Sequence, residues 1–300
     1  MSHNILITGA SGYLGGTLLA RWSSAKLPAY QSLYALVRTK EQAESVKQYG
    51  AEALTFDVKD EASTTAAIID HKVTIVYFLV DAMAGDSLVY IIKALAEVKK
   101  QTGQEGLDAN NTVIELAEAR GIRNYIFIPC IVYGQGEGFG NPISIQTVAI
   151  VRAAKKTGRV YSPHTNNPKW PVCHVIDNST LYLEILRNIL AGKDIGHGRN
   201  GYYLAASGSM AWNDIYGAMA KGLVKRQIVD TESVQVADDA ALQQMGEALG
   251  CPKEMVPLFL GGECTLEARH GHEIGWKPQY SPEHILEAAD AEVDLIIRHL

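Results

Sequence analysis

The sequence lacks an excess of positive charge and has no long apolar run. Its 27 lysines and arginines are outnumbered by 33 acidic residues, which gives a formal net charge of −6. A nucleic-acid binder needs a basic face, so we expect no nucleic-acid partner. No stretch approaches the roughly 18 apolar residues of a membrane span, and residues 1–4 include no cationic signal-peptide start. These absences predict a cytoplasmic protein with no membrane partner.

Closely spaced metal ligands are also missing. The four cysteines are far apart and include no Cys-x-x-Cys pair that would suggest zinc or redox chemistry. His270 and His272 lie two residues apart, but no further cluster of ligands accompanies them. We therefore predict no metal site.

A glycine-rich turn is the first strong pattern that the chain does contain. Residues 4–8 (NILIT) form a short apolar run, residues 9–16 break it, and residues 17–22 resume with helical character. This order suits a dinucleotide, because glycines let the backbone approach the pyrophosphate and the helix N-terminus offers free N–H groups. The cofactor-binding residues predicted in this turn are Gly9, Ser11, Gly12, Tyr13, Leu14 and Gly15.

The end of the predicted second strand, residues 32–37, discriminates between the two nicotinamide cofactors. An acidic residue there would bind the ribose 2′-hydroxyl of NAD, but this chain has Arg38. Because a guanidinium suits a 2′-phosphate, we expect NADP, with NAD as the alternative.

Strand and helix patterns alternate along the first half of the chain. Residues 53–56 are a plausible third strand, and residues 73–80 (VTIVYFLV) are typical of a buried parallel strand. We predict an α/β fold, a Rossmann-type doubly wound parallel sheet with a smaller C-terminal substrate-binding region. The predicted NAD(P)-binding domain covers residues 1–134. The substrate-binding region covers residues 135–300 and is interleaved with the last sheet strands and the C-terminal helices.

These motifs resemble those of the extended short-chain dehydrogenases/reductases, which include the NAD-dependent epimerases and dehydratases. Residues 8–15 match the fingerprint Thr-Gly-x-x-Gly-x-x-Gly in full, and residues 126–134 (IFIPCIVYG) resemble the sixth strand. Residues 170–177 (WPVCHVID) and 275–278 (GWKP) resemble later motifs in the same order. The resemblance implies further cofactor contacts at Asp57, Val58, Leu79, Val80, Asp81 and Pro129.

The catalytic pair of these enzymes, Tyr-x-x-x-Lys, is absent. None of the 14 tyrosines has a lysine four residues later, so the tyrosine that exchanges a proton and the lysine that lowers its pKa are both missing. The order of segments places the gap near residues 104–110, where a fifth strand with the catalytic serine would be expected. Either the fold has closed this gap or the 300-residue sequence omits a segment.

A second interpretation of this region takes residues 112–120 as the helix after strand four and residues 125–131 as strand five. We prefer the sixth-strand interpretation because Pro129 and residues 132–134 fit that motif in register. A mobile loop is expected at residues 135–141, followed by a helix from about residue 144 to residue 156.

Two functions are compatible with these patterns. The first is an NADP(H)-binding oxidoreductase or epimerase-like enzyme that acts on a small carbonyl or hydroxyl substrate. Tyr133 is its candidate acid, although a scaffold role is commoner there, and Asn141, Ser144 and Gln146 are either substrate contacts or ordinary loop and cap residues. The second is a non-catalytic dinucleotide-binding redox sensor similar to the NmrA-like regulators. The substrate and the oligomeric state stay open.

Overall fold

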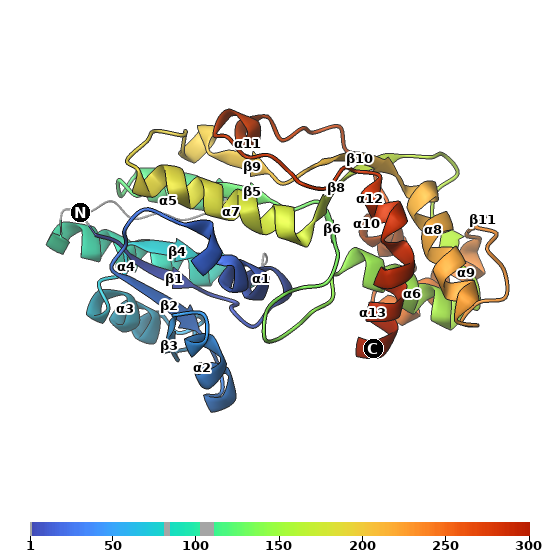
Figure 1. Cartoon of the computed structure of the whole chain (residues 1–300), viewed down its shortest axis with the longest axis horizontal. Helices are drawn as coiled ribbons and strands as arrows, with labels where there is room; N and C mark the ends of the chain where they lie inside the picture. The colour runs from blue at the N-terminus through green and yellow to red at the C-terminus, as the bar shows by residue number, and fades with distance from the viewer. Residues whose placement is uncertain (1, 81–84, 103–110) are drawn as a thin grey trace.

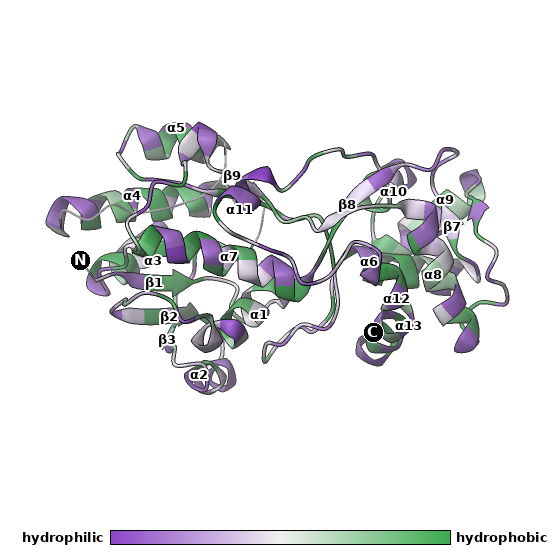
Figure 2. Ribbon diagram, turned by 45° about the horizontal axis from the view of Figure 1, so that its top comes forward, coloured by the Kyte–Doolittle hydropathy of each residue, from purple (hydrophilic) through white to green (hydrophobic). Residues whose placement is uncertain are grey.

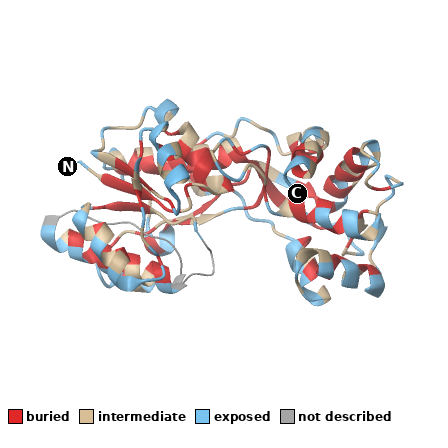
Figure 3. Cartoon of the chain, turned by 90° about the horizontal axis from the view of Figure 1, so that it is seen from below, coloured by how far each residue is buried: buried red, intermediate tan, exposed pale blue. Residues whose placement is uncertain are grey.

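In a computed structural model the chain forms two lobes joined by a narrow connection (Figure 1). The structure describes residues 2–80, 85–102 and 111–300. Each lobe has its own buried interior, and exposed residues cover the outside of both (Figure 3). Within the described ranges, no helix is long and apolar enough to cross a membrane.

The N-terminal lobe is built on a parallel sheet of four strands in the order β3-β2-β1-β4. Ile5 lies opposite Leu33 on one side of β1 and opposite Ile75 on the other side. The predicted Rossmann-type doubly wound sheet is therefore confirmed. These strands are β1 (Asn4–Ile7), β2 (Ser32–Leu36), β3 (Glu52–Leu54) and β4 (Ile75–Tyr77).

Helices cover both faces of this sheet because the strand side chains are apolar on both sides. Ile5 and Ile7 pack into the hydrophobic cluster that contains Leu18, whereas Leu6 points the other way into the cluster of Ile68. The side chains of Ile5, Leu6 and Ile7 are fully buried, and each such burial contributes about 1.5–3 kcal/mol. The helices around the sheet are α1 (Tyr13–Arg21), α2 (Lys40–Lys47), α3 (Glu61–Asp70), α4 (Gly85–Thr102), α5 (Asn111–Glu118) and α7 (Val175–Leu190).

Hydropathy follows the position of each element in the lobe. The strand β1 is hydrophobic, whereas α2 at the edge is largely hydrophilic (Figure 2). The side chain of Thr39 accepts a hydrogen bond from the backbone N–H of Gln42 and so caps the start of α2. Val46 is the buried residue that attaches this edge helix to the core.

The sheet is interrupted beyond β4. The next strand, β5 (Ile126–Ile128), pairs in parallel with β9 (Tyr202–Leu204), and among the described residues β4 and β5 share no hydrogen-bonded register. A strand five at residues 125–131 would pair with β4, so the observed pairing favours the sixth-strand interpretation. The omitted segment stays a prediction, and residues 103–110 lie outside the described residues.

The predicted sixth strand is divided in two. It breaks at Pro129, which has no backbone N–H to continue a ladder. The second part, β6 (Ile131–Tyr133), then joins the three-stranded sheet β10-β8-β6 that connects the lobes. The partner strands are β8 (Lys169–His174) and β10 (Gly208–Ala211).

The C-terminal lobe is mainly helical and has a separate hydrophobic cluster around Trp212 and Tyr216. In contrast, Leu181 and Tyr203 from the second half of the chain belong to the core of the N-terminal lobe. The domain boundary at residue 134 stays a prediction. The main helices of the C-terminal lobe are α6 (Gln146–Thr157), α8 (Trp212–Lys225), α9 (Asp239–Leu249), α10 (Val256–Phe259), α12 (His284–Glu287) and α13 (Ala289–His299).

The remaining elements are short. They are β7 (Tyr161–Ser162), β11 (Gln235–Val236), α11 (Arg269–Glu273) and the 3₁₀ turns Ser23–Ala25, Gly198–Asn200 and Lys253–Met255.

Candidate functional site

The glycine turn between β1 and α1 is less crowded at Gly12 than at Gly9 and Gly15. Gly9 has a φ of +65°, and a Cβ there would lie 2.5 Å from the carbonyl oxygen of Leu79. A Cβ on Gly15 would lie 2.3 Å from the carbonyl oxygen of Gly9. At Gly12, by contrast, the nearest described atom would be the Gly9 oxygen at 3.1 Å. The turn therefore packs tightly on two sides and leaves the backbone of Gly12 accessible at the start of α1.

A cavity of about 470 Å³ extends from this turn along the interruption in the sheet. Residues of β4 and β5 line it, together with Tyr182, Ile185 and Ile189 of α7. The cavity thus brings predicted cofactor and substrate contacts from separate segments together. The predicted residues that line it are Gly12, Tyr13, Leu14, Gly15, Leu79, Val80, Pro129, Asn141, Ser144 and Gln146.

The other predicted cofactor residues lie outside this lining. Arg38 follows β2, is exposed, and forms no ion pair with any other described residue. Asp57 follows the neighbouring strand β3, and its Oδ1 accepts a hydrogen bond of 2.9 Å from the backbone N–H of Lys59. Val58 is buried beside it. Asp81 lies outside the described residues.

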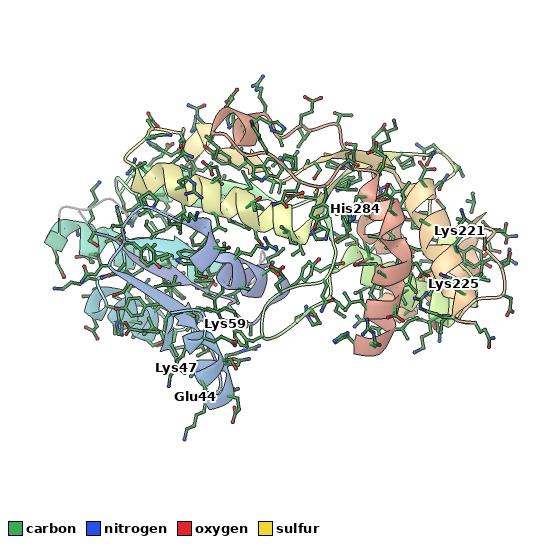
Figure 4. The ribbon with its side chains drawn as sticks, viewed as in Figure 1. Glu44, Lys47, Lys59, Lys221, Lys225 and His284 are labelled. Atoms are coloured by element: carbon green, nitrogen blue, oxygen red, sulfur yellow. The ribbon has the colours of Figure 1, made fainter. Side chains whose placement is uncertain are left out.

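The carboxyl edge of β2 and β3 also carries a second cation. Lys59 lies on the same side of the N-terminal lobe as α2, where Figure 4 also labels Glu44 and Lys47. Lys47 is paired with Glu44 at 2.7 Å, whereas Arg38, Lys40 and Lys59 form no ion pair with the other described residues. The edge is therefore suited to a phosphate group.

The loop expected at residues 135–141 is fastened to α1. The hydroxyl of Tyr13 donates a 2.6 Å hydrogen bond to the carbonyl oxygen of Gly134. Arg21 makes two bonds to the carboxylate of Glu137, Nε–Oε2 at 2.6 Å and Nη2–Oε1 at 2.7 Å. The backbone N–H of Asn141 donates to the carbonyl oxygen of Ser11 at 3.0 Å. These contacts hold the loop against the glycine turn.

A chain of hydrogen bonds leads from the cavity wall to a buried carboxyl group. The hydroxyl groups of Ser144 and Thr147 bond to each other, and Thr147 donates to Oε1 of Glu292 at 2.7 Å. The other oxygen of Glu292 accepts from the backbone N–H of Gly134 at 2.9 Å. Burial raises the pKa of Glu292, while these two hydrogen bonds oppose the rise.

Sequence reasoning missed Thr147 and Glu292. The signal for Glu292 is its place on α13, where it falls on the buried stripe with Ala289, Val293 and Ile296. A charged residue at such a position needs partners inside the protein. Thr147 gives no comparable signal, because threonine is ordinary in the first turn of a helix.

Tyr133 lies away from the cavity lining. Its side chain is 1% exposed, its hydroxyl lies 3.1 Å from Nδ1 of His284, and its ring meets His174 edge-on. Burial raises the pKa of Tyr133 well above its ordinary value. His284 belongs to α12 in the C-terminal lobe (Figure 4). This placement fits the scaffold alternative, and the acid role of Tyr133 stays a prediction.

His174 connects β8 to α7. Its Nδ1 accepts a 3.3 Å hydrogen bond from the backbone N–H of Ile176 and so caps the helix. Burial, helped by the nearby His284, lowers the pKa of His174 to about 4. A Cβ on Gly134, whose φ is +94°, would lie 2.3 Å from Nε2 of His174. The imidazole is therefore neutral at pH 7 and packed against a position that only glycine can occupy.

The sequence over residues 1–191 matches the model of the NmrA-like family. The chain belongs to the NmrA-like family. Another relative is the oxidase ucsJ of an Acremonium species, with 22% identity over 344 aligned positions that cover 94% of each chain. The alignment has more positions than the 300 residues of this chain. It therefore places gaps in this chain opposite residues of the oxidase.

Solved structures share the fold of this NmrA-like protein at low identity. The triphenylmethane reductase of a Citrobacter species superimposes with a TM-score of 0.65 at 15% identity, over 96% of this chain and 99% of its own. The UDP-glucose 4-epimerase of Thermotoga maritima gives a TM-score of 0.63 at 14% identity, over 99% of both chains. The predicted resemblance to the epimerase and dehydratase type is thereby confirmed at the level of the fold.

Proposed function

We propose that this NmrA-like protein is an oxidoreductase that binds NADP(H) on its glycine turn and acts on a small carbonyl or hydroxyl compound. The observation that carries the proposal is that the glycine turn and Asn141, Ser144 and Gln146 line the same cavity. The names of its structural relatives support the reaction class, since they include reductases and dehydrogenases, and the Citrobacter reductase is described in complex with NADP(H).

The residues present fit a dinucleotide. The first turn of α1 contains no acidic residue, so its N-terminus is free to hold a pyrophosphate beside Gly12. Arg38 would hold the 2′-phosphate, and the segment from Leu79 to Val80 and Pro129 would contact the remainder of the cofactor. When bound, the nicotinamide supplies or accepts a hydride, and the protein supplies binding and orientation.

The cavity walls define the kind of substrate that fits. Phe127, Tyr182 and Ile185 line it with apolar surface, while Asn141 and Ser144 add polar groups near the glycine turn. Phe127 and Tyr182 stack with ring centroids 3.6 Å apart, so they fix each other in the cavity wall. A mainly apolar molecule with one carbonyl or hydroxyl group therefore suits the site.

Titration with NADPH followed by turnover assays on a panel of carbonyl compounds tests this function. Tight NADPH binding with measurable oxidation by at least one compound, even at a low rate, is expected for an enzyme. The alternative, a redox sensor of the NmrA-like type, is favoured by the family membership and by the missing Tyr-x-x-x-Lys pair. A sensor should bind the cofactor without turnover, and failure to bind any dinucleotide would refute both.

A further inference from the structure

We propose that Ser144, Thr147 and Glu292 form a proton relay that connects the cavity to a buried carboxyl group. The inference rests on the proposed function, because it gives the substrate cavity a source of protons that does not need a Tyr-x-x-x-Lys pair. Glu292 is the proton reservoir, Thr147 is the link, and Ser144 is the group that meets the substrate.

The relay is continuous and buried. Ser144 lines the cavity and is 7% exposed, Thr147 is 1% exposed, and Glu292 is 4% exposed. Because the hydroxyl of Thr147 donates its one proton to Oε1 of Glu292, its oxygen is the acceptor for the proton of Ser144. Each hydroxyl has one donor and spare acceptor capacity, so the same chain can run in the opposite direction when the carboxyl is protonated.

The surroundings of Glu292 favour a carboxyl that changes its protonation state. Among the described residues it forms no ion pair, and its partners are the hydroxyl of Thr147 and the N–H of Gly134. The titratable groups that sense its charge are Tyr13, from α1, and Tyr133, from β6. Both are neutral at pH 7, and burial raises the pKa of Glu292 itself. A buried carboxyl without a cation accepts a proton more readily than an exposed one.

The proton transfer balances within the protein. In the forward direction the O–H bond of Ser144 breaks as the substrate oxygen gains a proton, and the Ser144 oxygen takes the proton of Thr147. Thr147 takes the proton of Glu292, which becomes a carboxylate. In the reverse direction a substrate hydroxyl gives its proton to Ser144, and the proton passes through Thr147 to Glu292. When no substrate is bound, a water molecule in the cavity can exchange a proton with Ser144 in the same way.

Exchange of the Glu292 proton for deuterium tests the relay without any cofactor. The infrared C=O band of the protonated carboxyl is identified as the band that Glu292→Gln removes. The protein is mixed with D₂O at a pH where this band is present. The band shifts when deuterium replaces the proton, so the time course of the shift gives the rate of exchange. We expect Thr147→Val to slow the exchange by about tenfold, the effect of one lost hydrogen bond, and Ser144→Ala to slow it as well. Thr147→Ser should restore the rate.

A matched variant separates the relay from general packing. Thr157→Val makes the same substitution at the other end of α6, where the hydroxyl bonds only to backbone carbonyls, and should leave the exchange unchanged. Exchange that is equal or faster in Thr147→Val would show that Glu292 exchanges by local opening and would overturn the relay. The relay would also be overturned if the wild-type protein showed no protonated-carboxyl band that is absent from the Glu292→Gln variant. Neither outcome depends on NADPH binding, which the titration above tests separately.

Discussion

The backbone of Gly15 in α1 packs against the carbonyl of Gly9 so closely that a Cβ on Gly15 would lie 2.3 Å from the oxygen. This contact fixes the start of α1 over the end of β1. Gly12, one turn earlier, has only the Gly9 oxygen near its missing Cβ, at 3.1 Å. The fold therefore restricts a side chain at Gly15 much more strongly than one at Gly12.

Gly12→Val should abolish dinucleotide binding while the chain stays folded. Its φ of −81° and ψ of 173° are extended values that valine adopts easily. The new Cβ would lie 3.1 Å from one atom, the Gly9 oxygen, so the loss of stability should be about 1–2 kcal/mol. The added side chain would fill the space that a pyrophosphate needs. Fluorescence titration with NADPH, together with thermal unfolding, measures both effects.

Gly15→Ala is the matched comparison for this variant. Its Cβ meets backbone atoms that cannot move aside, so it should lower the stability by about 1–3 kcal/mol. A folded Gly12→Val protein with unchanged NADPH affinity would mean that the ligand does not approach the turn.

The fold could be predicted to a large extent from the sequence because its main signals are local. The apolar run at residues 4–8 and the glycines after it specify a strand, a turn and a helix wherever they occur. The division of residues 126–134 into β5 and β6 was not predicted. Pro129 gave the hint, but the different partners of the two strands, β9 and β8, depend on segments about 40 to 80 residues away.

The site was predicted less completely than the fold, since it depends on contacts between distant segments. Asn141 and Ser144 were named from a polar loop, and the structure places both in the lining of the cavity. Glu292 lies about 145 residues from Thr147, and no local pattern relates the two. Tyr133 was chosen for its motif, but the motif could not show that its hydroxyl would face His284.

We expect NADPH to bind more tightly than NADH, and Arg38→Ala to remove most of the difference. Arg38 is exposed at the end of β2 with no anionic partner among the described residues. A charge-assisted contact to a 2′-phosphate contributes about 1.5–3 kcal/mol when well formed. Calorimetric titration of both cofactors measures the preference, and Lys47→Ala is the control because Lys47 is already paired with Glu44. Equal or stronger binding of NADH by the unmodified chain would contradict the prediction.

The neutral His174 should make the protein less stable as the pH falls. Its pKa is about 4 in the folded chain and about 6.5 in an unfolded one. As the pH falls, the unfolded state therefore binds a proton at a higher pH than the folded state does. The free energy of unfolding decreases from about pH 6.5 to about pH 4 and does not decrease further through His174 below that. At 1.36 kcal/mol per pKa unit, the total is up to roughly 3 kcal/mol.

His174→Asn isolates this effect. The asparagine side chain can still cap α7 but does not titrate, so the variant should lose less stability between pH 6.5 and pH 4. His3 and His164, whose pKa values burial also lowers, titrate in both proteins and cancel in the comparison. Denaturant unfolding across this range gives the two curves, and parallel curves would argue against a neutral His174.

The interrupted sheet leads to the last prediction, that this 300-residue chain reduces ordinary ketones slowly or not at all. The relay ends in the Ser144 hydroxyl, which is a weaker acid than the missing tyrosine, and a positioned general acid contributes about 10²–10⁴-fold. The chain has no Tyr-x-x-x-Lys pair, and among the described residues β4 and β5 do not pair with each other. A segment restored between residues 104 and 110, identified from the transcript or from the intact mass of the protein, should therefore supply the missing acid and raise NADPH oxidation by about that factor. Rapid oxidation by the 300-residue chain would contradict this. If Tyr133→Phe then abolished this oxidation, Tyr133 would be the acid. If Thr147→Val abolished it, the relay would be the source of the proton.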